Sequence, residues 1–123
     1  ILLICSLLSQ SELEEYQAMA TELGMSALVE AHDEREVEMA LRAEASIIGV
    51  NNRNLKTFTV DINNSARYRK MVPKEVAFVS ESGIKTAEDI AKLLENGTDA
   101  VLIGETLMRS ENKKQALDEL RGI

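Results

Sequence analysis

Short apolar runs alternate with longer amphipathic stretches along the whole chain. The runs are apolar at consecutive positions and rich in leucine and β-branched residues, as in strands buried on both faces of a parallel sheet. They lie at residues 1–4, 27–29, 47–50, 76–79 and 100–103. This pattern predicts five strands with a helix after each one.

Capping signals mark where the intervening helices begin and end. Ser9 and Glu12 form a capping box, and Gly24 is placed to end the helix that follows. Asp33 and Thr86 are the expected N-caps of two later helices. The apolar residues expected on the buried faces of the helices are Leu13, Tyr16, Ala20, Leu23, Val37, Ala40, Leu41, Ile90, Leu93, Leu94, Ala116, Leu117 and Leu120.

The repeated strand–helix unit of roughly 25 residues suits right-handed crossovers within one parallel sheet. The order fits either an open doubly wound sheet or part of a (β/α)₈ barrel, which in full has about 250 residues. No linker divides residues 1–123, so we expect no second domain. The chain begins at Ile1 inside an apolar run and without methionine, which predicts a fragment of a longer protein.

Acidic residues outnumber basic residues by 21 to 14, which gives a formal net charge of -7. This charge argues against nucleic acid or a membrane surface as a general partner, because both are polyanionic. It leaves room for one small anionic substrate at a local site. Cys5 is the only cysteine, which fits a reducing, cytoplasmic setting, and we expect it to be a small apolar residue at a strand end. No apolar run approaches the ~20 residues of a membrane span.

Two glutamates, Glu30 and Glu81, directly follow apolar strand segments. In parallel α/β folds, sites form at the carboxyl ends of the strands. A glutamate in a partly desolvated pocket can have its pKa tuned towards neutral and act as a general acid or base. The alternative is a solvated loop residue that pairs with a nearby Lys or Arg, and spacing alone leaves both readings open.

The ends of the last two predicted strands have the composition of an anion site. Ser82 and Gly83 follow one strand, and Gly104 and Glu105 follow the next. Backbone N–H groups at small residues can face an anion, and barrels often bind phosphate at their last two strands beside a short extra helix. Residues 105–109 are the expected short helix, whereas residues 61–71 are polar and predict a helix only weakly.

A third polar cluster, Asn51 to Asn54, combines three amides with the guanidinium of Arg53. Such groups suit a carboxylate, a hydroxyl or a ring edge, although asparagines also favour turns. His32 follows Glu30 by two residues, so both side chains point the same way on an extended chain. With no second His or Cys nearby, we expect a capping or hydrogen-bonded histidine and no metal site.

Four segments of the chain resemble the indole-3-glycerol phosphate synthase family. They are LVEAH at 28–32, IGVNNRNLKTF at 48–58, VSESGI at 79–84 and VLIGETLMR at 101–109. The NNRNLKT and SESGI motifs, in this order and at this spacing, are highly specific. The resemblance covers essentially the whole chain and implies the C-terminal part of a TIM (β/α)₈ barrel, about five βα units that begin at the fourth strand.

The resemblance also implies a reaction and the residues that perform it. The reaction is ring closure of 1-(2-carboxyphenylamino)-1-deoxyribulose 5-phosphate to indole-3-glycerol phosphate, with loss of carbon dioxide and water and without metal or organic cofactor. Glu30 and Glu81 resemble the active-site glutamates of the fifth and seventh barrel strands, and Glu30 would transfer a proton during dehydration. Asn51 would position the substrate, and Arg53 would bind its anthranilate side.

The phosphate-binding positions implied by the resemblance are Ser82, Gly83, Gly104 and Glu105. Position 105 is serine in many relatives, so Glu105 would contribute its backbone N–H. The family has two essential lysines and a further glutamate on its first and third strands, which this sequence does not include. We therefore expect a carboxy-lyase in the parent protein and an inactive fragment.

Two other functions stay open from the sequence. One is a different phosphate-binding barrel, such as a phosphoribosylanthranilate isomerase-like enzyme, which would want a Cys and an Asp as its acid/base pair. The other is a non-catalytic half-barrel that binds phosphorylated ligands. A five-strand arc would also leave two open, apolar sheet edges, which predicts self-association of the chain.

Overall fold

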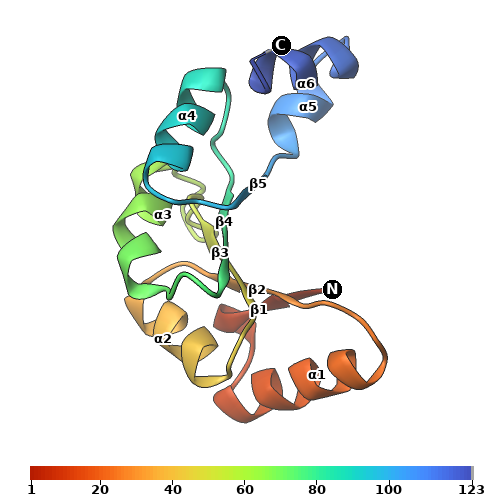
Figure 1. Cartoon of the computed structure of the whole chain (residues 1–123), viewed down its shortest axis with the longest axis vertical. Helices are drawn as coiled ribbons and strands as arrows, with labels where there is room; N and C mark the ends of the chain where they lie inside the picture. Colours follow the sequence, from red (N-terminus) through yellow and green to blue (C-terminus); the bar gives the residue numbers. More distant parts are fainter. Residues whose placement is uncertain (123) are drawn as a thin grey trace.

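The computed structural model describes residues 1–122, and the strands of this part of the chain form one parallel sheet. Its order, β1-β2-β3-β4-β5, follows the sequence without a reversal. A doubly wound sheet reverses its strand order at a switch point, so this topology is that of a barrel. Figure 1 shows the resulting crescent, with α1 to α4 along its convex side. The strands are β1 (Leu2–Ile4), β2 (Leu28–Ala31), β3 (Ile47–Asn51), β4 (Ala77–Glu81) and β5 (Ala100–Leu102).

The helices begin where the capping signals place them. The Ser9–Glu12 capping box is present, Asp33 accepts a hydrogen bond from the Glu36 backbone, and Thr86 forms a second box with its third following residue. Within residues 1–122, no helix has the length and apolar character needed to cross a membrane. The helices are α1 (Gln10–Glu22), α2 (Glu34–Arg42), α3 (Asn63–Tyr68), α4 (Ala87–Glu95), α5 (Glu105–Arg109) and α6 (Lys113–Leu120), with the 3₁₀ turns η1 (Cys5–Leu7) and η2 (Arg69–Met71).

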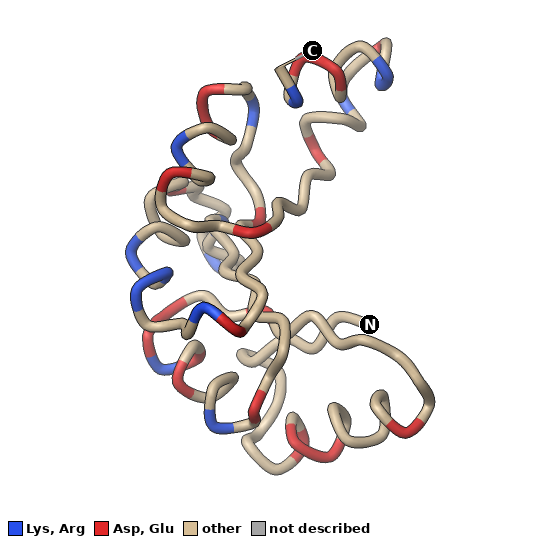
Figure 2. Tube along the Cα trace, in the orientation of Figure 1, with Lys and Arg blue, Asp and Glu red and all other residues tan. Residues whose placement is uncertain are grey.

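The core lies between the convex face of the sheet and the helices. Alternate strand residues point to opposite faces. On β2 and β3, Val29, Ala31, Ile48 and Val50 belong to this core, together with Val37 of α2. The residues between them in sequence therefore face the concave side of the sheet. Figure 2 shows that most charged residues lie on the helices and the connecting loops, so a carboxylate on the concave side is exceptional.

Three strands extend further than the apolar runs predicted. β2 includes Glu30, β3 ends at Asn51 and β4 ends at Glu81, whereas the sequence placed these residues just after the strands. The parallel ladder continues through them, since Asn51 pairs with Glu81 and Glu81 with Leu102. The polar residues are tolerated because their side chains face the concave side while their backbones remain paired.

Part of the predicted helix packing is wrong. Leu13 and Ala20 of α1 are buried, but Tyr16 is 39% exposed and Leu23 is 70% exposed. The same holds for α4 and α6, where Leu93 and Leu120 are buried while Leu94 and Leu117 are 65% and 43% exposed. Each helix of this arc packs against the sheet on one side only. One or two residues per helical turn are therefore enough to fill that contact. The apolar face of each helix is therefore wider than the surface that it buries against the described residues.

The end of β3 is fixed by the buried amide of Asn52, which is 3% exposed. Its Nδ2 donates to Ser80 Oγ at 3.0 Å and to the Ser82 carbonyl at 3.1 Å. Its Oδ1 accepts from the Ser65 backbone N–H at 2.9 Å. One side chain therefore joins the end of β3 to the end of β4 and to the first turns of α3.

Replacing Asn52 with alanine should destabilise the fold, because a buried N–H of Ser65 would lose its acceptor. We expect Asn52→Ala to lower the free energy of unfolding by about 2–3 kcal/mol. The exposed Asn54 is the matched control, since its side chain accepts only from Lys56 and Thr57 within its own turn. Asn54→Ala should cost less than about 1 kcal/mol. Urea unfolding monitored by circular dichroism measures both changes, and equal losses would contradict this role of Asn52.

The two edge strands carry exposed apolar side chains. Leu2 of β1 is 47% exposed and Leu102 of β5 is 49% exposed. Unpaired, apolar strand edges recruit other chains. We therefore predict that the 123-residue chain self-associates, by pairing edges or exchanging elements about a two-fold axis. Sedimentation velocity at micromolar concentration is the measurement, and a compact, folded monomer would contradict the prediction.

Candidate functional site

Three polar side chains meet on the concave face of the sheet, at the carboxyl ends of β2, β3 and β4. They are Glu30, Asn51 and Glu81, which are 4%, 8% and 2% exposed. Asn51 Nδ2 donates a hydrogen bond to Glu30 Oε1 at 3.1 Å. The structure thus brings together the three residues that the sequence singled out as a catalytic set, although they are far apart in the chain.

Gly49 creates the space in which Glu81 lies. It is the register partner of Glu30 on one side and of Val79 on the other. A Cβ atom at Gly49 would overlap Glu81 Oε1 and come within 3.0 Å of Leu28 Cδ1. The Glu81 carboxyl therefore crosses over β3 towards β2. Gly49 was missed from the sequence, although a glycine inside an apolar strand signals a close approach.

The Glu81 carboxyl is adapted to hold a proton. Burial, followed by the negative charge of Glu30, raises the pKa of Glu81 from 4.5 to about 8. Its Oε1 is buried and has no hydrogen-bond partner within residues 1–122. Two carboxyl groups in one desolvated site do not readily ionise together, because like charges repel with little screening. Near neutral pH, the Glu81 carboxyl therefore holds its proton.

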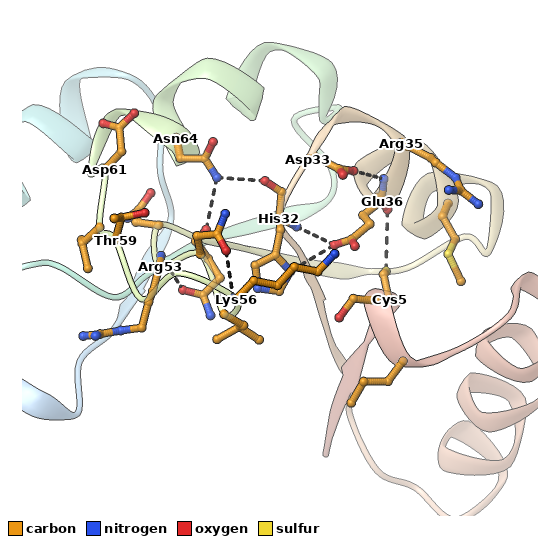
Figure 3. A pocket seen from close by; sticks show the side chains of 18 of the residues that line it. Cys5, His32, Asp33, Arg35, Glu36, Arg53, Lys56, Thr59, Asp61 and Asn64 are labelled. Atoms are coloured by element: carbon orange, nitrogen blue, oxygen red, sulfur yellow. Dashed lines mark hydrogen bonds and ion pairs between the residues drawn. The ribbon is translucent and has the colours of Figure 1, made fainter.

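His32 lies between two carboxylates, those of Glu30 and Glu36, and Figure 3 shows its ring beside Glu36. Its Nδ1 is 3.0 Å from Glu36 Oε2, and its Nε2 is 3.3 Å from Glu30 Oε1. The expectation of a hydrogen-bonded histidine is confirmed. Glu36 was missed, although its i, i+4 spacing from His32 on the first turn of α2 is a recognisable signal. No group of three His, Cys, Asp or Glu side chains within residues 1–122 is arranged to hold a metal.

An open cavity lies beside this cluster. Its volume is about 880 Å³, and its lining includes His32, Asn51, Arg53 and Lys56. Cys5 also borders it, but the thiol is buried, and burial followed by the nearby negative charge of Glu36 raises its pKa to about 12. The thiol is therefore an unreactive part of the core, as the sequence predicted, and the cavity is polar mainly through its carboxylates, amides and cations.

The residues predicted to bind phosphate gather at a second cavity, next to the first. Ser82 and Gly83 follow β4 in consecutive left-handed conformations, with φ of 67° and 77°. Gly83 also has no room for a Cβ, because Val60 packs against it. Thr106 Oγ1 donates to the Ile84 carbonyl at 2.7 Å, which ties this turn to the segment after β5. The Ser82 N–H is 3.4 Å from the Leu102 carbonyl and so is only weakly engaged.

Arg53 connects the two cavities, since it lines both. Its backbone N–H donates to Asn51 Oδ1 at 2.9 Å, and it forms an antiparallel bridge with Val60. Its guanidinium pairs closely with Glu105, whose other oxygen accepts from Arg109 Nε at 3.0 Å. Hydrogen bonds from Arg109 and then from Arg53 lower the pKa of Glu105. A carboxylate thus stands among the residues expected to bind phosphate.

The Asn51–Asn54 cluster divides into separate roles. The first cavity is lined by all four residues, and the side chain of Asn52 forms the buried hydrogen bonds described above. Asn54 closes a local turn through its side chain. The turn interpretation is confirmed for Asn54, whereas ligand binding by Asn51 and Arg53 stays a prediction.

Comparison with known proteins identifies the relatives of this chain. The model of the family described as indole-3-glycerol phosphate synthase matches residues 1–120. The enzyme of that name from Ruminiclostridium cellulolyticum is 59% identical over 122 residues, which are 99% of this chain and 47% of that protein. The one from Leuconostoc mesenteroides is 52% identical over the same shares of the two proteins. The chain thus spans about half the length of the curated relatives it matches.

Solved structures with low sequence identity share the fold. Thiamine phosphate pyrophosphorylase from Pyrococcus furiosus has a TM-score of 0.72 at 17% identity, over 89% of this chain and 52% of that one. The BexX/CysO complex of Amycolatopsis orientalis gives 0.67 at 18% identity, over 93% of this chain and 47% of the other. These likenesses concern the fold alone. The family model and the identities above 50% agree with the motifs at the ends of β2, β3, β4 and β5. The chain belongs to the indole-3-glycerol phosphate synthase family.

Proposed function

We propose that this chain is the C-terminal part of an enzyme that closes the indole ring of indole-3-glycerol phosphate, with loss of carbon dioxide and water. The observation that carries the proposal is the buried set of Glu30, Asn51 and Glu81 at one end of the sheet. Burying two carboxyls beside each other costs stability, and such a cost is typical of a site that moves protons. The relatives named above support the choice of reaction.

In this proposal the two carboxyls have different roles. Glu30, which accepts from Asn51, acts as the base in the dehydration step, and Glu81, whose pKa is raised, holds a proton at neutral pH. Pairs of titratable groups with separated pKa values are the usual source of an acid and a base in one site. Asn51 fixes the position of Glu30 and contacts the substrate, and Arg53 binds the anthranilate carboxylate.

The phosphate of the substrate would lie in the second cavity. We propose that backbone N–H groups of Ser82, Gly83, Gly104 and Glu105 bind it. The consecutive left-handed residues at Ser82 and Gly83 support this, because such turns direct successive N–H groups to one side. The Glu105 carboxylate, which pairs with Arg53, would have to turn away when phosphate enters.

An isomerase-like reaction has weaker support. It would want a cysteine as an acid or base, and Cys5 is a buried thiol whose pKa is raised to about 12. A non-catalytic half-barrel would not need a buried carboxyl pair. We also propose that residues 1–123 form one undivided barrel unit, as expected from the sequence. A cytoplasmic location is likewise a proposal from the sequence.

We predict that the chain alone does not form indole-3-glycerol phosphate. Adding the N-terminal half of the Ruminiclostridium cellulolyticum relative should restore this activity. No strand within residues 1–122 carries a lysine. In this proposal ring closure needs a cationic general acid beside the substrate carbonyl, which typically contributes ~10²–10⁴-fold and which the neutral Glu81 carboxyl does not replace. The guanidinium of Arg53 stays protonated and cannot act as this acid. In the reconstituted enzyme Glu30→Gln should abolish turnover, whereas Ser82→Ala should mainly raise KM. Fluorescence of the indole product reports the rate, and appreciable activity of the chain alone would show that its general acid lies within it.

We further predict that inorganic phosphate binds at the second cavity and that its affinity follows local charge. Ser82→Glu should weaken binding by at least about fivefold, because like charges at contact distance repel by about 1 kcal/mol or more. Glu105→Gln should strengthen it, since a carboxylate is removed from the site. Ser11→Glu, an exposed change on α1, is the control with the same added charge. Calorimetric titration measures each affinity, and equal effects of the two Ser→Glu changes would contradict the assignment.

A further inference from the structure

Glu36 fixes His32 in one orientation. Glu36 Oε2 accepts the backbone N–H of His32 at 2.7 Å and lies 3.0 Å from ring Nδ1. Glu36 is itself held, because its N–H donates to Asp33 Oδ1 at 2.9 Å and its carbonyl accepts from Cys5 Sγ at 3.7 Å. Since the same oxygen already accepts a backbone N–H, Nδ1 meets it as a donor. Figure 3 shows the His32 ring beside Glu36. The other ring nitrogen, Nε2, lies 3.3 Å from Glu30 Oε1.

The contact with Glu30 is buried and otherwise unexplained. His32 Nε2 is 3.3 Å from Glu30 Oε1, with side chains that are 17% and 5% exposed. Nε2 has no hydrogen-bond partner within residues 1–122, so this carboxylate is its polar neighbour. Nothing in the fold requires a histidine here, because the backbone of His32 is already held by Glu36 and by Asn64, which donates to its carbonyl at 3.0 Å.

The two carboxyls of the site have unequal surroundings. Glu30 Oε1 receives Asn51 Nδ2 at 3.1 Å and faces the imidazole. Glu81 lies over Gly49 with a buried, unpartnered oxygen in the described part of the chain. A proton shared by two such groups stays on the one with fewer donors, because the charged form of the other is better stabilised. These surroundings therefore favour the negative charge on Glu30 and the proton on Glu81.

We propose that His32, held by Glu36 and donating from both ring nitrogens as an imidazolium, is a positioning residue that keeps Glu30 ionised and leaves the shared proton of the pair on Glu81. It acts through Glu30, so it sets which carboxyl accepts and which donates a proton in the reaction proposed above, on which its catalytic meaning rests. The titratable groups around the ring are Glu30 of β2, Glu36 of α2, Asp33 at the N-cap of α2, and Glu81 of β4 beyond Glu30. Cys5 of η1 adds no charge, because burial keeps it a thiol. Arg35 and Lys56 line the same cavity.

The proposal is tested on the chain itself by carbon-13 NMR of labelled glutamate carboxyls near pH 6.5, below the pKa of about 8 of Glu81. The resonances are assigned by their loss in Glu30→Gln and Glu81→Gln. In the unsubstituted chain, Glu81 should appear protonated and Glu30 ionised. In His32→Leu the ratio of the Glu81-protonated to the Glu30-protonated state should fall by about tenfold or more. His32→Gln, which keeps a donor without charge, should give an intermediate ratio.

If His32→Leu does not fold, Glu36→Gln is the second test. It keeps the imidazole of His32 and removes the negative charge next to its Nδ1. It should change the ratio in the same direction. Glu38→Gln is the matched control, because Glu38 is exposed on the same helix and its ion pair is with Arg42. Resonances of Glu30 and Glu81 that stay unchanged in the folded His32 and Glu36 variants would overturn the proposal, as would a protonated Glu30 in the unsubstituted chain.

Activity of the reconstituted enzyme gives a second readout that a purely structural histidine would not affect. His32→Leu should lower kcat about tenfold or more with KM nearly unchanged. The alkaline limb of the pH profile should move to higher pH, because Glu30 without its imidazole neighbour disfavours the doubly ionised pair. Reconstituted enzyme that is inactive without any substitution would count against the proposed function, while the NMR result would still decide the role of His32. Wild-type kcat and an unshifted limb in His32→Leu would overturn that role.

Discussion

Two carboxyl groups lie buried side by side on the concave face of a parallel sheet, and much of the local structure exists to accommodate them. The alternation of strand residues places Glu30 and Glu81 on that face while Val29, Ile48 and Phe78 fill the core behind it. Gly49 lacks the side chain that would otherwise occupy the space of the Glu81 carboxyl. The cost of desolvation is partly offset by a proton on one group and by donors around the other.

The loops around this pair are held by hydrogen bonds, with little apolar packing. Asn52, Ser65 and Ser80 form a buried polar cluster that joins β3, β4 and α3. Because each of these groups is satisfied, the cluster restricts the strand ends to one arrangement. Arg53 directly follows Asn52, and Ser82 comes two residues after Ser80. Both residues are therefore held in fixed positions at the edge of the two cavities. The positions of the strand ends at the site thus depend on this buried cluster.

The sequence predicted the architecture well because its signals are local. The capping boxes at Ser9 and Thr86 and the apolar runs depend on neighbours within four residues, and the structure has the helices and strands they indicate. The polar residues at the strand ends were recognised, and the family motifs located the candidate site. The exposure of Leu23 and Leu94 could not be predicted, because it depends on which elements lie beyond each helix. The roles of Gly49 and Glu36 depend on side chains brought together from different strands and helices.

The sequential strand order has a consequence for how the site responds to partial unfolding. Within residues 1–122 each strand pairs only with its neighbours in the sequence, so opening at an edge propagates inwards one strand at a time, as in a repeat array. Glu30, Asn51 and Glu81 lie on the three inner strands and survive the loss of either edge. Gly104 and Glu105 follow the edge strand β5 and depart with it. Fraying of β5 would therefore uncouple the proposed anion-binding half of the site from the proposed proton-transferring half, and hydrogen exchange in the two halves should be governed by different opening events.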